Sequence, residues 1–306
     1  MDNSNIYLYK RPQNYIPRVA AIHDMCGYGK CSLGIAIPVL SAAGCDVCPI
    51  PTAIFSSHTK YKVFAMHDMT QFLPEFLDAW QNCPVELDAI YSGFLGSSDQ
   101  VDIIQRVYRE HPLALRIVDP VMGDNGKMYT TYTSELCDAM RSLVDNADIL
   151  TPNLTEASIL TGIPYQGQDI DDSTIERYVN ALLEMGAKNV VLKGITHHDS
   201  SCMSSIKTID SLCMSTSTIT NYVAGTNVEL TGIRSQLLPF MLHGTGDLYA
   251  ATLLAGIMTG KSLLDSAIFA ADFVIHAMNI TRTQPDYQLR GVSFESQLWR
   301  IGELTH

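Results

Sequence analysis

The residues with the clearest chemical potential form the run Gly244-Thr245-Gly246-Asp247, which opens an apolar, small-residue segment of helical character. The glycines let consecutive backbone N–H groups turn toward one point, and the helix adds its own free N–H groups and the positive end of its dipole. Such a nest can hold a phosphate without a lysine. Asp247 is placed to accept the proton of a hydroxyl group that attacks phosphorus. The same residues are also compatible with an ordinary acidic first turn of a helix.

The chain around this run has the pattern of an α/β fold. Short apolar runs typical of buried strands alternate about six times with longer segments of helical period, as in a parallel sheet covered by helices. We predict strands at residues 19–23, 46–51, 89–92, 116–118, 149–150 and 189–192. We predict helices at residues 32–43, 70–83, 98–110, 134–146, 153–162, 171–185 and 247–258, several of which begin with Asp, Ser or Thr.

The segment 197–240 breaks this rhythm. Its Ser and Thr residues alternate with Ile, Val and Cys, which predicts antiparallel strands and turns. The sequence contains no internal repeat, low-complexity tract or proline-rich linker that would divide it. We therefore expect one domain over residues 1–306, with residues 1–17 as an N-terminal extension and about 197–240 as a small β-rich excursion.

Polar and glycine residues follow most of the predicted strands. In an open parallel sheet, ligands bind beyond the carboxyl ends of the strands, so these residues are expected to gather at one edge. A purely structural sheet would not need them there. They are His23 and Asp24, Thr52, Ser92-Gly93-Phe94, residues 119–124 (DPVMGD), Thr151-Pro152-Asn153 with Glu156, and Lys193-Gly194.

Composition narrows the class of partner. The chain has 32 acidic and 20 basic residues, a net charge of −12, so no field of positive charge attracts nucleic acid or anionic lipid. Hydrophobic residues make up 46% and charged residues 17%, as in a globular protein. The first residues carry no apolar run of signal-peptide length, and no segment is an uninterrupted apolar run of membrane length. We expect a cytoplasmic protein that binds neither nucleic acid nor membrane.

The eight cysteines are scattered, which favours reduced thiols over a disulfide framework. Cys45 and Cys48 form a Cys-x-x-Cys pair. A zinc site needs a second pair or nearby histidines, and neither Cys26 with Cys31 nor the His197-His198 pair supplies a convincing partner. We therefore expect buried cysteines that act as small hydrophobic residues.

Residues 26–32 (CGYGKCS) have some likeness to a phosphate-binding P-loop. A P-loop needs glycine where this chain has Asp24, and Ser or Thr where it has Cys31. A Gly-x-Gly-x-x-Gly dinucleotide fingerprint is missing from this stretch as well. We therefore expect neither a P-loop nor a dinucleotide-binding site here.

Four motifs in order carry a resemblance to a known family: residues 92–97 (SGFLGS), residues 119–124, Thr151-Pro152-Asn153 with Glu156, and Gly244-Thr245-Gly246-Asp247. Together they resemble the ribokinase-like superfamily, and within it the pyridoxal kinases, over about residues 19–278. The resemblance implies a three-layer sandwich with a mostly parallel central sheet. It also implies an ATP-dependent kinase that phosphorylates the 5′-hydroxyl of pyridoxal, pyridoxine or pyridoxamine in the salvage of pyridoxal phosphate. Mg²⁺, often a monovalent cation such as K⁺, and a homodimer belong to the same expectation.

The resemblance assigns the phosphoryl-transfer residues one by one. Asp247 matches the catalytic base, and the backbone of Gly244, Thr245 and Gly246 matches the anion hole. The positions that match the ATP site are Asp119, Asp124, Asn153, Glu156, Lys193, Leu242, His243, Gly244 and Gly246. Of these, Asp119, Asp124 and Glu156 are the implied Mg²⁺ ligands, because carboxylates among phosphate oxygens need a cation to neutralise both.

Explanations without a role in ATP binding remain open at three of these positions. Asn153 and Glu156 have the spacing of a helix cap and a first-turn acid. Lys193 could be a solvated lysine.

The glycine-bearing loop at 123–129 is expected to fold over the nucleotide during turnover and exclude water.

The substrate side implied by the resemblance comprises Asp24, Thr52, Phe55, His58, Phe94 and Asp247. Phe94 stands where many relatives have tyrosine, which keeps ring packing but loses a phenol hydrogen bond. Asp24 stands where many pyridoxal kinases have serine. A carboxylate there would prefer a protonated pyridine nitrogen or an ammonium group, unless Asp24 only caps a loop.

Two other functions stay open. Hydroxymethylpyrimidine (phosphate) kinases of thiamine biosynthesis share the sheet, the lysine and the Gly-x-Gly-Asp run, although the SGFLGS and FSSHT runs favour vitamin B6. A non-catalytic B6- or nucleotide-binding sensor would keep the fold without turnover, against which the intact Asp247 and its glycines argue.

Overall fold

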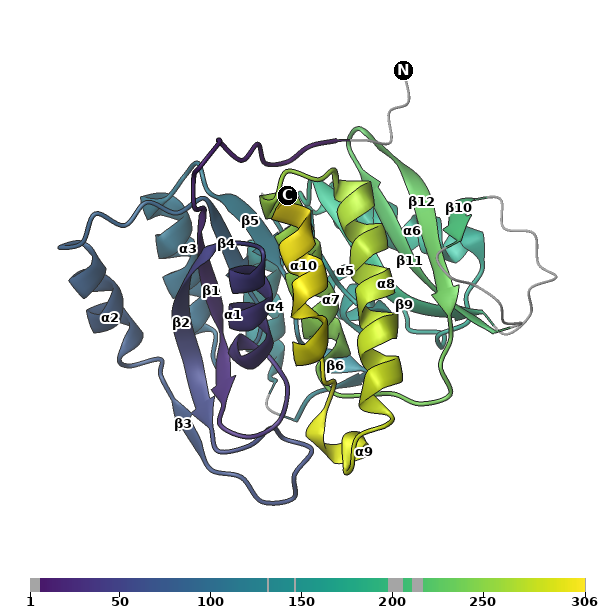
Figure 1. The fold of residues 1–306 in the computed structure, drawn as a ribbon, viewed down its shortest axis with the longest axis horizontal. Helices are drawn as coiled ribbons and strands as arrows, with labels where there is room; N and C mark the ends of the chain where they lie inside the picture. Colours follow the sequence, from purple (N-terminus) through teal and green to yellow (C-terminus); the bar gives the residue numbers. More distant parts are fainter. Residues whose placement is uncertain (1–5, 131, 146, 198–205, 211–216, 306) are drawn as a thin grey trace.

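One mixed sheet between two layers of helices dominates the computed structural model, which describes residues 6–130, 132–145, 147–197, 206–210 and 217–305 (Figure 1). Within these residues the sheet has ten strands in the order β10-β12-β11-β9-β8-β5-β4-β1-β2-β3. Its six central strands run parallel. They are β1 (Arg18–Cys26), β2 (Asp46–Phe55), β4 (Ala89–Ser92), β5 (Leu115–Val118), β8 (Ile149–Leu150) and β9 (Asn189–His197). The predicted α/β class and parallel sheet are confirmed.

Each face of the sheet builds its own apolar core because side chains alternate along a strand. On β1, Val19 and Ala21 join one cluster, and Ala20 and Ile22 join the other. The first face is covered by α1 (Leu33–Ala42), α7 (Thr245–Met258), α8 (Leu263–Thr281) and α10 (Leu298–Gly302). The second is covered by α2 (Leu73–Trp80), α3 (Asp99–Glu110), α4 (Ser134–Val144), α5 (Leu154–Thr161) and α6 (Asp172–Glu184).

The predicted helices begin close to their expected caps. Side chains of Thr133, Asn153 and Asp171 accept hydrogen bonds from backbone N–H groups three residues ahead, which satisfies donors that a helix start leaves free. The helix α8 and the short elements α9 (Tyr287–Arg290), η1 (Glu295–Gln297), α10 and η2 (Glu303–Thr305) were not predicted.

The β-rich segment extends the main sheet. β11 (Thr218–Gly225) pairs antiparallel with β9 and with β12 (Val228–Gln236), as predicted. β10 (Lys207–Asp210) differs, since it pairs parallel with β12. The rest of this segment, residues 198–205 and 211–216, lies outside the described residues. The expected excursion is thus the outer part of one continuous sheet (Figure 1).

Three strands are longer than predicted, which corrects the placement of three site residues. β1 runs to Cys26 and therefore contains Asp24. β2 continues to Phe55 because β3 (Met66–Asp68) pairs with its last residues, and β9 continues to His197 because β11 lies beside it. Thr52 and Lys193 therefore lie inside strands and not after them.

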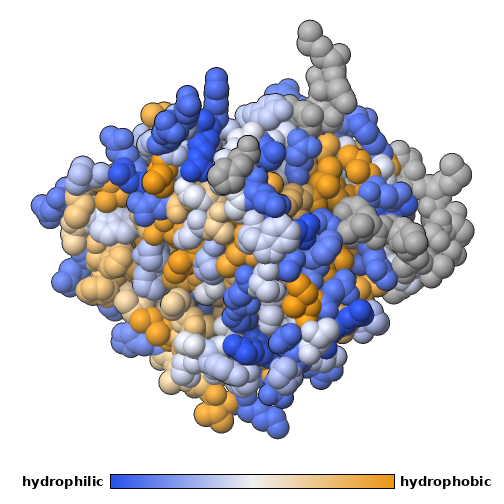
Figure 2. Space-filling model, in the orientation of Figure 1, coloured by the Kyte–Doolittle hydropathy of each residue, from blue (hydrophilic) through white to orange (hydrophobic). Residues whose placement is uncertain are grey.

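The helix α8 is long and apolar enough, by length and composition alone, to cross a membrane. The sequence expectation relied on uninterrupted runs, and α8 is interrupted by Asp265 and Asp272. In the structure α8 packs against α7, and its Ala267, Ala270 and Phe273 are fully buried. Figure 2 shows this side of the molecule as a mixture of hydrophilic and hydrophobic residues. The helix is therefore part of the core on this face.

Candidate active site

Charged side chains from four elements converge where the carboxyl ends of the parallel strands meet the start of α7. Asp119 follows β5, Glu156 lies in α5, Lys193 lies in β9 and Asp247 lies in α7. Each of Glu156 and Asp247 feels the charges of Asp119 and Lys193. The sheet edge predicted from the sequence is thus the place where these groups meet.

Lys193 is buried and ion-paired, so it is not a solvated lysine. Its Nζ donates to Asp119 Oδ1 at 2.7 Å, and Thr151 Oγ1 donates to the same oxygen at 2.9 Å. Burial alone would lower the lysine pKa, but Asp119 and Glu156 raise it overall, which keeps Lys193 a cation. A Cβ added to Gly246 would lie 3.7 Å from Nζ, so the ammonium group reaches the start of α7.

Asp247 has the properties of a general base that works near neutral pH. Burial, followed by the charge of Asp119, raises its pKa to about 7, although a hydrogen bond from the Ser32 backbone and the charge of Lys193 act in the opposite direction. A base whose pKa lies near the working pH accepts a proton most effectively. Ser32 itself has a φ of 49°, an uncommon conformation for a residue with a side chain.

The start of α7 presents backbone N–H groups, as the sequence predicted. Gly244 precedes the helix in a left-handed conformation with φ of 84°, and a Cβ there would lie 2.3 Å from the Lys30 carbonyl oxygen. Gly244 offers no side chain to cap the helix. Thr245 Oγ1 donates back to the Leu242 carbonyl oxygen at 3.2 Å and leaves the N–H groups free of its own hydroxyl. Gly246 is exposed.

Asn153 and Glu156 form a capping box at the start of α5, as the structural alternative for these two residues predicted. Glu156 N donates to Asn153 Oδ1 at 2.9 Å, and Asn153 N donates to Glu156 Oε2 at 2.7 Å. The other carboxylate oxygen accepts from Met122 N at 3.3 Å. Burial raises the Glu156 pKa to about 8. Both residues thus have a structural role beside the site, and their predicted ATP contacts stay predictions.

Residues 123–128 form a small hairpin over this edge, β6 (Gly123–Asp124) with β7 (Lys127–Met128). Its turn residues Asn125 and Gly126 have φ of 51° and 74°, the positive values of a type I′ turn. Asn153 Nδ2 donates to the Gly123 carbonyl oxygen at 2.8 Å. Asp124 is half-buried and accepts hydrogen bonds from the Asn125 backbone and side chain.

The residues predicted for the substrate side lie together around the end of β2. The rings of Phe55 and Phe94 meet edge to face at 6.0 Å, and Thr52 Oγ1 donates to the Phe94 carbonyl oxygen at 2.9 Å. The rings of His58 and His243 lie 4.5 Å apart. Burial, with His58 as a further cause, lowers the His243 pKa to about 3, so its imidazole is neutral.

Asp24 is buried at the end of β1. Its Oδ2 accepts a hydrogen bond from Cys26 Sγ at 3.4 Å, and Ser32 bonds it as well. Burial raises the pKa of Asp24. Its charge also acts on Asp247, so the two carboxyl groups lie near each other.

Sequence reasoning missed three features of this edge. Ser32 holds Asp247 through its backbone, which no side-chain motif reveals. Tyr129 has its pKa raised by burial and then by Glu156 and Asp124, so its phenol lies among the carboxylates. Cys26 and Cys31 come together beside Asp24, although their spacing looked unpromising.

Two surface cavities of about 420 and 600 Å³ lie elsewhere. They are lined by residues at the amino ends of β4 and β5, among them Asp88, Leu115 and Arg116. Neither cavity includes the charged groups at the carboxyl ends of the strands, so we identify the candidate site from those groups.

Comparison with known proteins identifies the family of this chain. The family model described as phosphomethylpyrimidine kinase matches residues 36–290. Fold and site together define a ribokinase-like kinase. The chain belongs to the phosphomethylpyrimidine kinase family.

Individual relatives cover nearly the whole chain. It is 29% identical over 285 residues to pyridoxal kinase PdxY of Haemophilus influenzae, covering 90% of this chain and 93% of the relative. A Bacteroides thetaiotaomicron structure assigned to the phosphomethylpyrimidine kinases and solved with pyridoxal is 31% identical, with a TM-score of 0.84 over 94% of this chain and 96% of that one. The pyridoxal kinase of Lactobacillus plantarum is 28% identical, with a TM-score of 0.81 over 95% and 98% of the two chains.

Proposed function

We propose that this protein is an ATP-dependent kinase of vitamin B6 vitamers, which transfers the γ-phosphoryl group to the 5′-hydroxyl of pyridoxal, pyridoxine or pyridoxamine. Its product would enter the pool of pyridoxal phosphate by salvage. The relatives named pyridoxal kinase over about 90% of the chain support this substrate class.

One observation carries the chemistry: Asp247, with a pKa of about 7, lies in the first turn of α7 beside free backbone N–H groups and within reach of Lys193. Asp247 accepts the proton of the attacking hydroxyl. The N–H groups after Gly244 and the Lys193 ammonium stabilise charge on the transferring phosphoryl group. Catalysis here is mainly positioning and charge stabilisation.

The donor set at this edge fits a hard divalent cation such as Mg²⁺. Lys193 feels the charges of Asp119, Glu156 and Asp247, so three carboxyl groups surround one ammonium group. Carboxylate oxygens are the ligands that Mg²⁺ prefers. Asp119 and Asp124, with Glu156, would hold the ion, which supplies charge neutralisation at the phosphates when bound.

The remaining roles are those that the resemblance implies. Leu242 and His243 precede the nest and would lie beside the adenine, while Asp24, Thr52, Phe55, His58 and Phe94 would surround the pyridine ring. The β6–β7 hairpin, held by Asn153, would close over the phosphates and keep water out.

A second candidate is phosphorylation of hydroxymethylpyrimidine or its phosphate. The description of the matching family favours it. Its acceptor is also a heteroaromatic ring with a hydroxymethyl group, so the same base and nest would serve it.

A substrate panel tests the proposed function. The purified chain is given ATP, Mg²⁺ and, in separate reactions, pyridoxal, pyridoxine, pyridoxamine or hydroxymethylpyrimidine, and products are identified by mass. We expect a phosphorylated B6 vitamer with the highest kcat/KM. A phosphorylated pyrimidine alone would assign the second candidate, and no product with any acceptor would favour a binding protein.

The assembly and location remain proposals. A homodimer is supported by exposed apolar side chains on and between β2 and β3, namely Ile54, Val63, Phe64 and Met66. Orange and pale orange residues gather in that part of Figure 2, at the lower left. K⁺ dependence, a single kinase domain and a cytoplasmic location stay predictions.

A further inference from the structure

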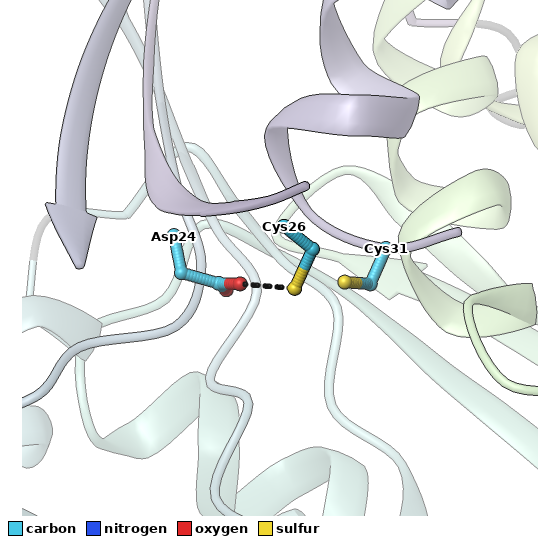
Figure 3. A group of neighbouring side chains, drawn as sticks. All are labelled: Asp24, Cys26 and Cys31. Carbon is cyan, nitrogen blue, oxygen red and sulfur yellow. Dashed lines mark hydrogen bonds between the residues drawn. The ribbon is translucent and has the colours of Figure 1, made fainter. Parts of the chain in front are cut away.

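A carboxylate and two thiols converge beside the proposed base, at the turn from β1 into α1. They belong to Asp24, Cys26 and Cys31, and one ligand atom from each lies within 4.8 Å of the other two. Figure 3 shows the Asp24 carboxylate and both sulfur atoms turned toward one another beneath this turn. All three side chains are buried.

We propose that Asp24, Cys26 and Cys31 form a binding site for a thiophilic divalent cation of the Zn²⁺ class, separate from the hard-cation site at the phosphates. The two thiol protons pass to solvent as the sulfur–metal bonds form. Oxygen-only donors suit Mg²⁺, whereas a pair of thiolates selects the softer ion.

The spacing of the three donors suits a tetrahedral ion. With bonds of about 2.3 Å to sulfur and 2.0 Å to oxygen, neighbouring ligands of zinc stand roughly 3.5 to 3.8 Å apart. Cys26 Sγ already lies 3.4 Å from Asp24 Oδ2, and the Cys31 thiol bonds Cys26. Small side-chain rotations therefore suffice to place all three donors around one ion.

The surrounding charges favour a cation. Cys31 lies close enough to Asp24 and Asp247 to feel both charges. Lys30, the neighbouring basic residue in the chain, pairs instead with Glu295. The apolar neighbours Phe55 and Ala53 shield the cluster on one side, which strengthens electrostatic attraction.

The other cysteine pair makes a matched control. Cys45 packs into the core on the α1 face, whereas Cys48 packs against the core on the other face, so this Cys-x-x-Cys pair does not converge. Cys45 lies just before β2 and Cys48 lies within it, so the Cys-x-x-Cys spacing alone does not bring the two thiols together.

Three protein ligands leave the fourth position of a tetrahedral ion open, as in exchangeable rather than closed structural sites. The effect on activity rests on the proposed function. A bound ion would engage the Asp24 carboxylate and restrain Ser32, which hydrogen-bonds both Asp24 and Asp247. The ion would therefore inhibit the kinase by competing with the B6 vitamer and not with ATP.

Cobalt supplies a readout that does not depend on activity. Co²⁺ is titrated into the reduced full-length chain without nucleotide, and thiolate-to-cobalt charge transfer is followed in the near ultraviolet. We expect a saturable band from one equivalent, displaced by one equivalent of Zn²⁺. Cys26→Ser and Cys31→Ser should weaken Co²⁺ binding by more than about tenfold. Loss of a residue that only supports a metal ligand already costs about that much, and loss of a ligand should cost more. Cys45→Ser and Cys48→Ser should leave the band unchanged.

Asp24→Asn gives a further arm if a serine variant does not fold, as judged by circular dichroism. It should keep the sulfur band but bind Co²⁺ more weakly. A band that survives in both Cys26→Ser and Cys31→Ser, or that disappears in Cys45→Ser, would overturn the proposed site. Failure of every substrate in the kinase panel would instead overturn the proposed function, since the cobalt titration is independent of turnover.

Discussion

Lys193 is the residue whose environment decides how the proposed site titrates. Its Nζ lies 2.7 Å from Asp119, and its charge lowers the pKa of both Glu156 and Asp247. The resemblance named this lysine, but only the structure gives its partner. Sequence reasoning placed it after a strand because the continuation of β9 depends on pairing with β11, a contact distant in sequence.

Replacing Lys193 by Gln removes this charge and keeps a donor for Asp119. We expect kcat/KM to fall by roughly 10²-fold, as for loss of a donor to a developing charge. The pKa of Asp247 should rise, so the acidic limb of the pH profile of kcat/KM should move to higher pH by about one unit.

Lys188→Gln is the matched control, because Lys188 also makes a 2.7 Å ion pair, with Asp148, but is exposed. It should change neither kcat/KM nor the pH profile. A Lys193→Gln profile that overlays the parent profile would contradict the role given to Lys193.

The glycines at the start of α7 serve both the helix and the proposed anion site. Gly244 and Gly246 were predicted from spacing as an anion nest, and the structure begins α7 at Thr245 between them. The approach of the Lys30 carbonyl to Gly244 could not be predicted, because it depends on how the turn after β1 packs against α7.

Three glycine-to-alanine variants separate fold from function at this element. Gly246→Ala meets only an ordinary contact with Lys193, so we expect stability to change by less than about 1 kcal/mol while kcat/KM falls, because a methyl group crowds the nest. Gly244→Ala adds a collision at 2.3 Å to a φ of 84°. It should destabilise by more than the roughly 1–3 kcal/mol of backbone strain alone.

Gly260→Ala supplies the strain without the collision, since its φ is 89° and nothing lies within 4 Å of the added Cβ. Chemical denaturation of the three variants gives the comparison. Equal destabilisation by Gly244→Ala and Gly260→Ala would contradict the expected cost of the collision with the Lys30 carbonyl oxygen.

At the scale of the whole molecule, the site carries a cost in stability. Burial and neighbouring charge raise the Asp247 pKa from 3.8 to about 7, so the folded state binds more protons than the unfolded chain between these values. The contribution of this group to stability is therefore present at acid pH and is lost as pH rises toward 7. Such a penalty is common where function requires a poorly solvated charge.

Asp247→Asn removes that ionisation. Without nucleotide or divalent cation, we expect it to raise the free energy of unfolding at pH 8 by about 1–3 kcal/mol and to have less effect at pH 5. Asp99→Asn, at the exposed first turn of α3, should lack this gain. An Asp247→Asn effect that is the same at both pH values would contradict the assigned burial.

The sheet and most helices were predictable because local periodicity and capping decide them, as for β4 and α5. The pairing of β10 and the membership of α8 in the core depend on tertiary contacts instead. The same division holds for the site: its glycines and carboxylates could be named from the chain, whereas the Ser32 contact and the Asp24, Cys26 and Cys31 cluster required the folded turn.

The most direct test of the account is the turnover of Asp247→Asn on the best B6 vitamer, measured beside its affinity for ATP. If Asp247 takes the proton of the attacking hydroxyl, kcat falls by at least about 10²-fold while the dissociation constant for ATP is unchanged. A variant that keeps nearly all of the parent kcat would contradict the central role of this carboxylate.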